Sequence, residues 1–80
     1  MVTIITLQSP VAISKNHLPE YYIYVDESNN GNKEYKVFDS LTKTISMCVK
    51  NTIVSIDEFL RTNFVDCTPD KGWNINKVSV

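Results

Sequence analysis

The chain has few of the residues that cofactor and metal sites require. Its 80 residues include two glycines, two cysteines and one histidine. Phosphate-binding loops place glycines in frames such as G-x-x-x-x-G-K or G-x-G-x-x-G, and neither Gly31 nor Gly72 stands in one. Structural zinc sites need clustered ligands, whereas Cys48, Cys67 and His17 lie far apart in the sequence. We therefore expect no cofactor and no metal site.

Groups that could carry catalysis are equally sparse, so we expect that the protein is not an enzyme. A Cys–His pair would need His17 to meet a cysteine, but a solvated loop suits this histidine better. We expect Cys48 and Cys67 to be buried thiols in a reducing compartment, since free cysteine is among the most buried residue types. Asp57 and Glu58 are adjacent, and on a helix their side chains point about 100° apart. They suit the positive N-terminal end of a helix instead.

The sequence also lacks long apolar runs and an excess of one charge. No stretch approaches the roughly 18 apolar residues of a membrane span, and the N-terminal segment has no basic flank typical of a signal peptide. We therefore expect a cytoplasmic protein without membrane contact. Eight basic residues stand against nine acidic ones, for a net charge of −1. Nucleic acid binding usually leaves a basic footprint, so the composition disfavours it.

The residues that are abundant indicate one small globular domain, covering 1–80. The hydrophobic fraction of 42% is ordinary for a folded chain of this length. Asn and Ile occur eight times each and Lys seven times, against one Ala and one Arg. The enriched residues have A/T-rich codons, a bias often found in small proteins of bacteriophages and mobile elements.

Runs of β-branched and alternating residues predict three strands in the first half of the chain. These strands are Val2–Gln8, Tyr21–Asp26 and Lys33–Phe38. Asn30–Gly31 offers the positive φ angles of a tight turn, so the second and third strands should form a hairpin. Pro10 interrupts the first strand, which Val11–Ile13 could resume briefly, and Ser14–Pro19 reads as a loop.

The segment after this hairpin fits two structures. A helix capped by Asp39 or Ser40 and ended by Asn51 would gather apolar residues on one face. Those residues are Leu41, Ile45, Cys48 and Val49. Ile45, Met47 and Val49 also alternate as in a strand, and the threonines between them are poor helix formers. We favour the helix and leave the strand open.

A second helix is predicted from Ile56 to Asn63. Ser55 and Glu58 form an S-x-x-E capping box at its start. Its buried face should carry Ile56, Phe59, Leu60 and Phe64, with Phe59 and Leu60 as core anchors. Whether 41–63 forms one bent helix or two elements stays open.

The chain should end in a strand at Trp73–Val80, after a turn at Pro69–Gly72. The apolar positions change parity between Ile75 and Val78, which suggests a bulge near Asn76. Together the elements predict an α+β fold. It would be a small antiparallel sheet of three or four strands, with one or two helices packed on one face.

The tyrosines of the second strand are the best functional signal. Tyr22 and Tyr24 share a face with Asp26, and the more apolar opposite face should lie under the helix. The two rings then point outward, beside Lys36 or Tyr35 according to the register, unless they pack on one another or on the first strand. Exposed tyrosines are common at protein interfaces. The predicted partner-binding residues are Tyr22, Tyr24, Asp26 and Lys36.

These observations predict a small non-enzymatic protein-binding module that acts as an inhibitor or regulator. The composition favours a phage or mobile element as its source and a host or defence protein as its partner. The alternative is a nucleic-acid-binding domain that stacks bases on an aromatic sheet face, with Lys33 and Lys36 on phosphates. The oligomeric state is left open.

Overall fold

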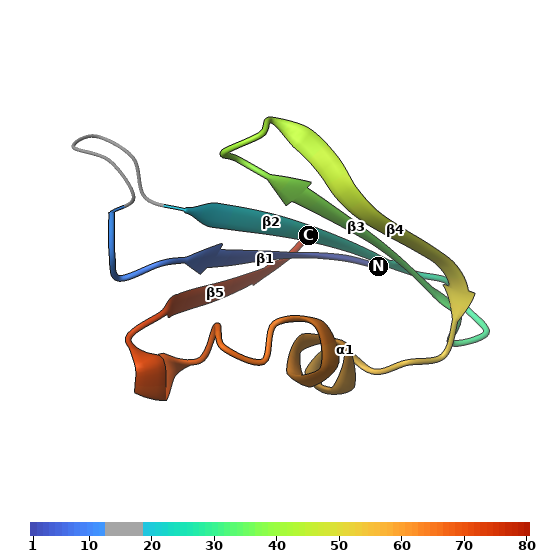
Figure 1. The fold of residues 1–80 in the computed structure, drawn as a ribbon. Helices are drawn as coiled ribbons and strands as arrows, with labels where there is room; N and C mark the ends of the chain where they lie inside the picture. Colours follow the sequence, from blue (N-terminus) through green and yellow to red (C-terminus); the bar gives the residue numbers. More distant parts are fainter. Residues whose placement is uncertain (13–18) are drawn as a thin grey trace.

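Residues 1–12 and 19–80 are described by a computed structural model (Figure 1). The elements are β1 (Val2–Gln8), β2 (Glu20–Glu27), β3 (Lys33–Asp39), β4 (Thr44–Thr52), α1 (Ile56–Asn63), the 3₁₀ turn η1 (Pro69–Lys71) and β5 (Asn74–Ser79). The α+β fold and the antiparallel sheet are confirmed, but the sheet has five strands rather than three or four. His17 and most of the predicted Ser14–Pro19 loop lie outside the described residues.

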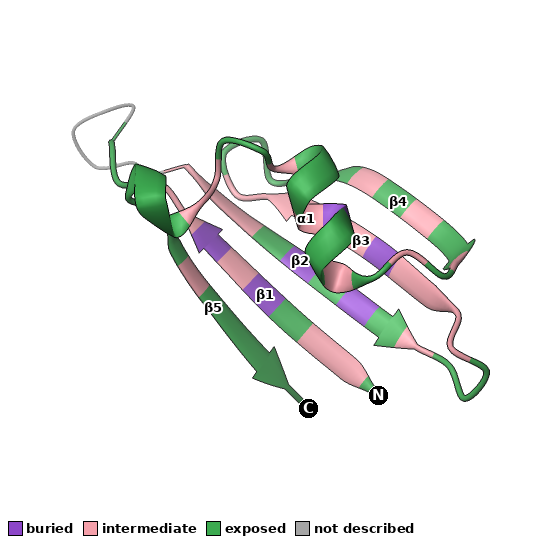
Figure 2. Ribbon diagram, turned by 90° about the horizontal axis from the view of Figure 1, so that it is seen from below, coloured by how far each residue is buried: buried purple, intermediate pink, exposed green. Residues whose placement is uncertain are grey.

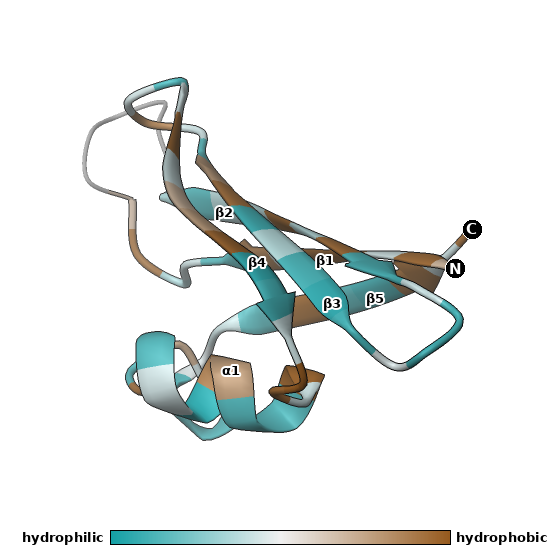
Figure 3. Cartoon of the chain, turned by 90° about the vertical axis from the view of Figure 1, so that its right-hand side faces the viewer, coloured by the Kyte–Doolittle hydropathy of each residue, from teal (hydrophilic) through white to brown (hydrophobic). Residues whose placement is uncertain are grey.

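The sheet has the strand order β4-β3-β2-β1-β5, and every neighbouring pair is antiparallel. The last strand therefore returns to the first, and β4 and β5 are the two edges. In the described part of the chain α1 lies against one face of this sheet, which Figure 3 shows nearly edge-on. No helix among the described residues covers the opposite face.

The β2–β3 hairpin forms as predicted, through a longer turn. The Ser28 amide donates to the Asn32 carbonyl at 2.8 Å, and the Gly31 amide donates to the Ser28 carbonyl at 3.1 Å. Gly31 has φ = 83°, whereas Asn30 is not in the left-handed region. We had expected positive φ at both residues, as in a two-residue turn. The loop Ser28–Asn32 closes with one left-handed residue.

The predicted helix, capped by Asp39 or Ser40 and ended by Asn51, is wrong. Residues 41–43 lie in a turn, and Thr44–Thr52 forms β4 and pairs with β3, so the strand alternative is confirmed. Asp39 does act as a cap, but of a turn: its Oδ1 accepts the Leu41 amide at 2.9 Å. The Lys43 amide donates to the Asp39 carbonyl at 2.8 Å, and Lys43 takes φ = 58°. This turn reverses the chain, so the alternating residues Met47 and Val49 pack on the core from the edge strand.

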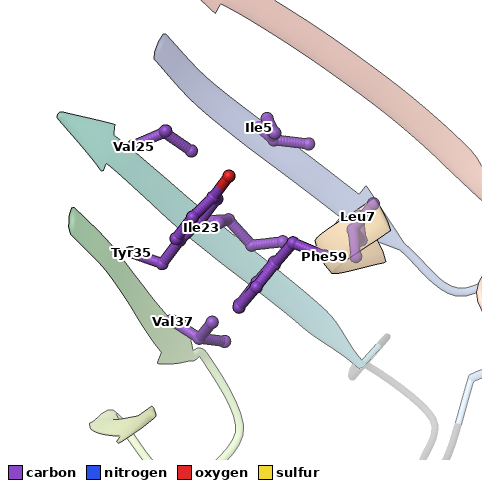
Figure 4. Close-up of a cluster of buried hydrophobic side chains, with 7 residues drawn as sticks. All are labelled: Ile5, Leu7, Ile23, Val25, Tyr35, Val37 and Phe59. Atoms are coloured by element: carbon purple, nitrogen blue, oxygen red, sulfur yellow. The ribbon is translucent and has the colours of Figure 1, made fainter. Parts of the chain in front are cut away.

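The core lies between α1 and the inner face of β1, β2 and β3. Among the described residues, seven hydrophobic side chains are buried: Ile5, Leu7, Ile23, Val25, Tyr35, Val37 and Phe59. Figure 2 shows buried positions alternating with more exposed ones along β1, β2 and β3. Figure 4 shows the Phe59 ring lying against the Tyr35 ring. Phe59 is confirmed as a core anchor, and Leu60 is a half-buried neighbour of the core.

The start of α1 follows the predicted capping pattern. Ser55 is the N-cap, and its Oγ accepts the Glu58 amide at 3.2 Å. Asp57 and Glu58 stand in the first turn and Arg61 in the last, which suits the helix dipole at both ends. Phe64 closes the helix through its amide, which donates to the Leu60 carbonyl at 2.9 Å.

β5 forms where predicted, but without the expected bulge near Asn76. Its pairing with β1 runs without a shift from Gln8–Asn74 to Thr3–Ser79. The parity change between Ile75 and Val78 has a simpler cause: Ile75 faces the core side and Val78 faces the opposite side. A strand at the sheet edge can carry apolar residues on both faces.

The prediction that both cysteines are buried is wrong for Cys48. It lies exposed on β4 opposite Lys36 because the segment is a strand rather than a helix. Cys67 is half-buried beside the core, and burial raises the pKa of its thiol. Both thiols are free.

Candidate protein-binding surface

The sheet face opposite α1 carries the predicted binding residues, and we call it the outer face. Along β2 the side chains alternate strictly between the two faces. Ile23 and Val25 are 0% and 2% exposed, whereas Tyr22 and Tyr24 are 37% and 39% exposed. The predicted orientation of the two tyrosines is therefore confirmed. Asp26 is exposed on the same face.

The register places Lys36, and not Tyr35, beside the tyrosines. Tyr24 pairs directly with Lys36, whose Nζ lies 6.0 Å from the centre of the Tyr24 ring. Tyr35 pairs with Val25 on the inner face and is fully buried. Burial raises the pKa of the Tyr35 phenol, which donates a hydrogen bond to the Val54 carbonyl.

The outer face also contains apolar residues near the tyrosines that the sequence analysis did not assign to it. They are Ile4, Phe38, Ile45 and Val78. Phe38 pairs with Tyr22, and their ring centres lie 6.2 Å apart. Ile4 lies between Tyr24 and Val78 in the register of the three strands β2, β1 and β5. The alternation in β1 could have placed Ile4 outward, since Ile5 and Leu7 share one face of the strand and Ile4 shares the other with Thr6.

Ile45 reaches this face through an irregularity in β4. Val37 pairs with Met47 and Phe38 pairs with Ile45, so that Ser46 is an extra residue on β4. This bulge sets Ile45, which is 60% exposed, opposite Phe38. Ile45, Phe38, Tyr22, Tyr24, Ile4 and Val78 form an apolar stripe that crosses all five strands. We call these six residues the outer stripe.

Acidic side chains flank the outer stripe on both sides, near the two ends of β2. Asp26 and Glu34 stand directly opposite each other on β2 and β3, an arrangement of like charges that weakens strand pairing. Lys36 Nζ lies 3.3 Å from Glu34 Oε1 and offsets one of the two charges. At the other end, a hydrogen bond to the Glu20 carboxylate raises the pKa of the Tyr22 phenol.

The described residues show no arrangement typical of a metal site. Within 1–12 and 19–80, no three His, Cys, Asp or Glu side chains gather closely enough to hold a metal ion. The same part of the chain contains no helix long and apolar enough to span a membrane. The outer face therefore stands out by its exposed aromatic and aliphatic area.

No protein family, curated protein or solved structure matches this chain.

Proposed function

We propose that the protein is a small binding module that occupies the surface of a partner protein with its outer face and does not catalyse a reaction. The outer stripe carries this proposal. Six apolar residues that are wholly or partly exposed form a continuous band across a rigid sheet. Contiguous apolar area on a small domain is typical of an interaction site, and tyrosine is enriched among the residues that dominate binding energy.

The charges around the outer stripe favour a partner with a basic rim. Glu20, Asp26 and Glu34 contribute three carboxylates, against Lys36, which is paired with Glu34, and the exposed Lys50 of β4, so acidic groups are in excess. A lysine or arginine of the partner near Asp26 would relieve the repulsion between Asp26 and Glu34. Because interfaces pair complementary potentials, we propose that the partner presents an apolar patch bordered by basic side chains.

The same charges argue against a nucleic acid on this face. Tyr22, Tyr24 and Phe38 offer rings on which bases could stack. The phosphates would then lie beside the carboxylates that flank the outer stripe, and these would repel them. Nucleic acid binding is therefore the second candidate, supported by the aromatic rings alone.

We further propose that binding inhibits or regulates the partner, and that the protein acts in a cytoplasm. The excess of amino acids that have A/T-rich codons supports a phage or mobile-element source. In that case the partner would be a host or defence protein. The two free thiols fit a reducing compartment.

The test is affinity capture followed by identification of the retained macromolecule. The purified protein and its Tyr22→Ala/Tyr24→Ala variant are immobilised in parallel and exposed to a bacterial lysate. We expect a protein that the native chain retains and the variant loses. Ile53→Ala serves as the matched control, because Ile53 is 80% exposed outside the outer stripe. Retention of nuclease-sensitive material instead would support the second candidate.

A further inference from the structure

A second surface lies at the β5 edge of the sheet, on the α1 side of β5, whereas Val78 of the outer stripe lies on the opposite side of the same strand. Between α1 and the inner face of β5 the structure has an apolar hollow of about 320 Å³. It is lined mainly by Leu60, Arg61, Phe64, Val65, Cys67 and Ile75, together with the polar Thr68. A wider hollow of about 550 Å³ shares Leu60, Arg61 and Ile75 with it and extends to Lys77. We call this continuous space the edge groove.

The strand above the edge groove has a free and regular edge. β5 is the last strand of the sheet, and its register with β1 is unbroken. The other edge strand, β4, has two register shifts and a residue with positive φ, Asn51. Bulges and twists of this kind block the addition of another strand, and β5 has none of them. Figure 2 shows β5 largely exposed along its length.

The backbone groups that point out from this edge can be assigned. The Val80 amide donates to the Val2 carbonyl at 2.8 Å, so Val2 and Val80 form a hydrogen-bonded pair. Antiparallel ladders alternate between hydrogen-bonded and non-hydrogen-bonded pairs. The backbone groups of Val78 and Asn76 therefore face β1, and those of Ile75, Lys77 and Ser79 face the free edge.

The same alternation fixes which side chains of an added strand would reach the edge groove. Residues that pair with Ile75 and Lys77 through their backbone would point to the inner face, as Ile75 and Lys77 do. The residue opposite Ile75 would lie over the apolar hollow. The residue opposite Lys77 would lie over the charged part of the groove.

The charges that line the edge groove indicate which residue of an added strand should lie opposite Lys77. Lys77 Nζ lies 3.6 Å from Asp57 Oδ1, and these two charges offset each other. Arg61 lines both hollows and takes part in none of the ion pairs among the described residues. The groove therefore has one uncompensated positive charge, which a single carboxylate would complement.

We propose that β5 binds an extended peptide segment of a partner protein as a sixth, antiparallel strand. The segment carries an acidic residue opposite Lys77 and, two positions later, a large apolar residue opposite Ile75. The backbone hydrogen bonds of strand addition supply affinity, and the two inward side chains supply selectivity. This surface is independent of the outer stripe, which lies on the opposite face.

The test uses a threonine-rich peptide with Asp-Thr-Leu at its centre, titrated against the ¹⁵N-labelled protein. Two control peptides replace the central sequence by Lys-Thr-Leu and by Asp-Thr-Ser. We expect the first peptide to shift the amide signals of Ile75, Lys77 and Ser79 and to slow their hydrogen exchange. The Lys-Thr-Leu peptide should bind up to about fivefold more weakly, since an exposed ion pair contributes up to about 1 kcal/mol. The Asp-Thr-Ser peptide should also bind more weakly, because serine leaves the apolar hollow unfilled.

Three variants separate the contributions of the charge and of the backbone. Arg61→Glu should reverse the preference, so that the Lys-Thr-Leu peptide binds more tightly than the Asp-Thr-Leu peptide. Lys77→Pro removes an amide that faces the free edge, whereas Lys77→Thr removes the same charge and keeps the amide. Only the proline variant should lose the protection from hydrogen exchange that the peptide gives to the amides of Ile75 and Ser79.

Three outcomes would overturn the proposal. The first is the absence of a preference for the Asp-Thr-Leu peptide over both controls. The second is a set of shifts confined to residues away from β5. The third is protection of the edge amides in the free protein that grows with its concentration, which would show a second copy on this edge. Tyr22→Ala/Tyr24→Ala should bind the peptide as the native chain does, so failure here and failure of the outer-face proposal are distinguishable.

Discussion

Tyr35 and Phe59 stack across the space between the sheet and the helix, with ring centres 4.1 Å apart and planes inclined by 10°. Tyr35 lies on β3 and is fully buried, and Phe59 is the one buried residue of α1. The Tyr35 hydroxyl donates to the Val54 carbonyl in the connection that leads into α1. The Tyr35 side chain thus positions both α1 and the segment before it.

We expect Phe59→Ala to lower the free energy of unfolding by about 3–5 kcal/mol, because it empties the centre of the core. A domain of this size has a comparable total stability, so the variant should be largely unfolded. Circular dichroism and urea denaturation measure this, with Phe59→Leu as a milder variant and Ile53→Ala as the exposed control. A folded Phe59→Ala protein with native stability would contradict the position of α1.

Lys43 offers a test of the β3–β4 turn. Because Lys43 has φ = 58°, a side chain there is strained, and Lys43→Gly should raise the stability by about 1 kcal/mol. A helix over the same residues would give the opposite sign, since glycine inside a helix costs about 1 kcal/mol relative to alanine. Chemical denaturation of Lys43→Gly beside Lys50→Gly, a glycine within β4, measures the sign directly.

The residues near this turn show why sequence alone predicted some elements and not others. β1, β2 and α1 have strong local signals: β-branched runs, strict alternation and the Ser55 cap. β4 has the periodicity of a helix and of a strand at once, and pairing with β3, a non-local interaction, decides between them. The Asp39 signal was real, but the hydrogen bond to the Leu41 amide caps a turn.

The outer stripe was predicted in part for the same reason. Alternation along β2 is a local property, and it placed Tyr22 and Tyr24 outward. The position of Ile45 depends on the bulge at Ser46, and no residue of β4 indicates that bulge by itself. The expected bulge near Asn76 failed because apolar residues were assumed to share one face, whereas Val78 belongs to the outer stripe.

Stability should fall in alkaline solution. Burial is the first cause of the raised pKa of Tyr21, Tyr35 and Cys67, so the folded protein favours their neutral forms. This contribution is fully present below the pKa of the unfolded chain, about 8.5 for cysteine and about 10 for tyrosine. It is lost as the pH rises through the higher folded-state values.

Urea denaturation between about pH 7 and about pH 10.5 measures this loss. Cys67→Ala should flatten the lower part of the curve and Tyr21→Phe the upper part, because each removes one titrating group. Cys48→Ala is the matched control for the first variant, since Cys48 is exposed. Stability that is constant or rises across this range would contradict the burial of these groups.

The last prediction concerns the outer stripe. Tyr22→Ala and Tyr24→Ala should each weaken binding of the captured partner by about 2 kcal/mol or more, as is typical of aromatic anchors in an interface. Both residues are more than one-third exposed, so the fold should persist, which circular dichroism and thermal melting check. The affinity lost in Tyr22→Ala should be the smaller of the two, because the Phe38 ring lies 6.2 Å from that of Tyr22 and can cover part of the gap.

Asp26→Lys should also weaken binding, because the partner is proposed to have a basic rim. Lys36→Ala, which exposes an additional carboxylate at Glu34, should leave it unchanged or strengthen it. Isothermal titration at low and high salt completes the test, since a mainly apolar contact loses little affinity in salt and a phosphate contact loses much. Native-like affinity of both tyrosine variants would place the binding surface elsewhere on the molecule, and the edge groove would then be the next surface to probe.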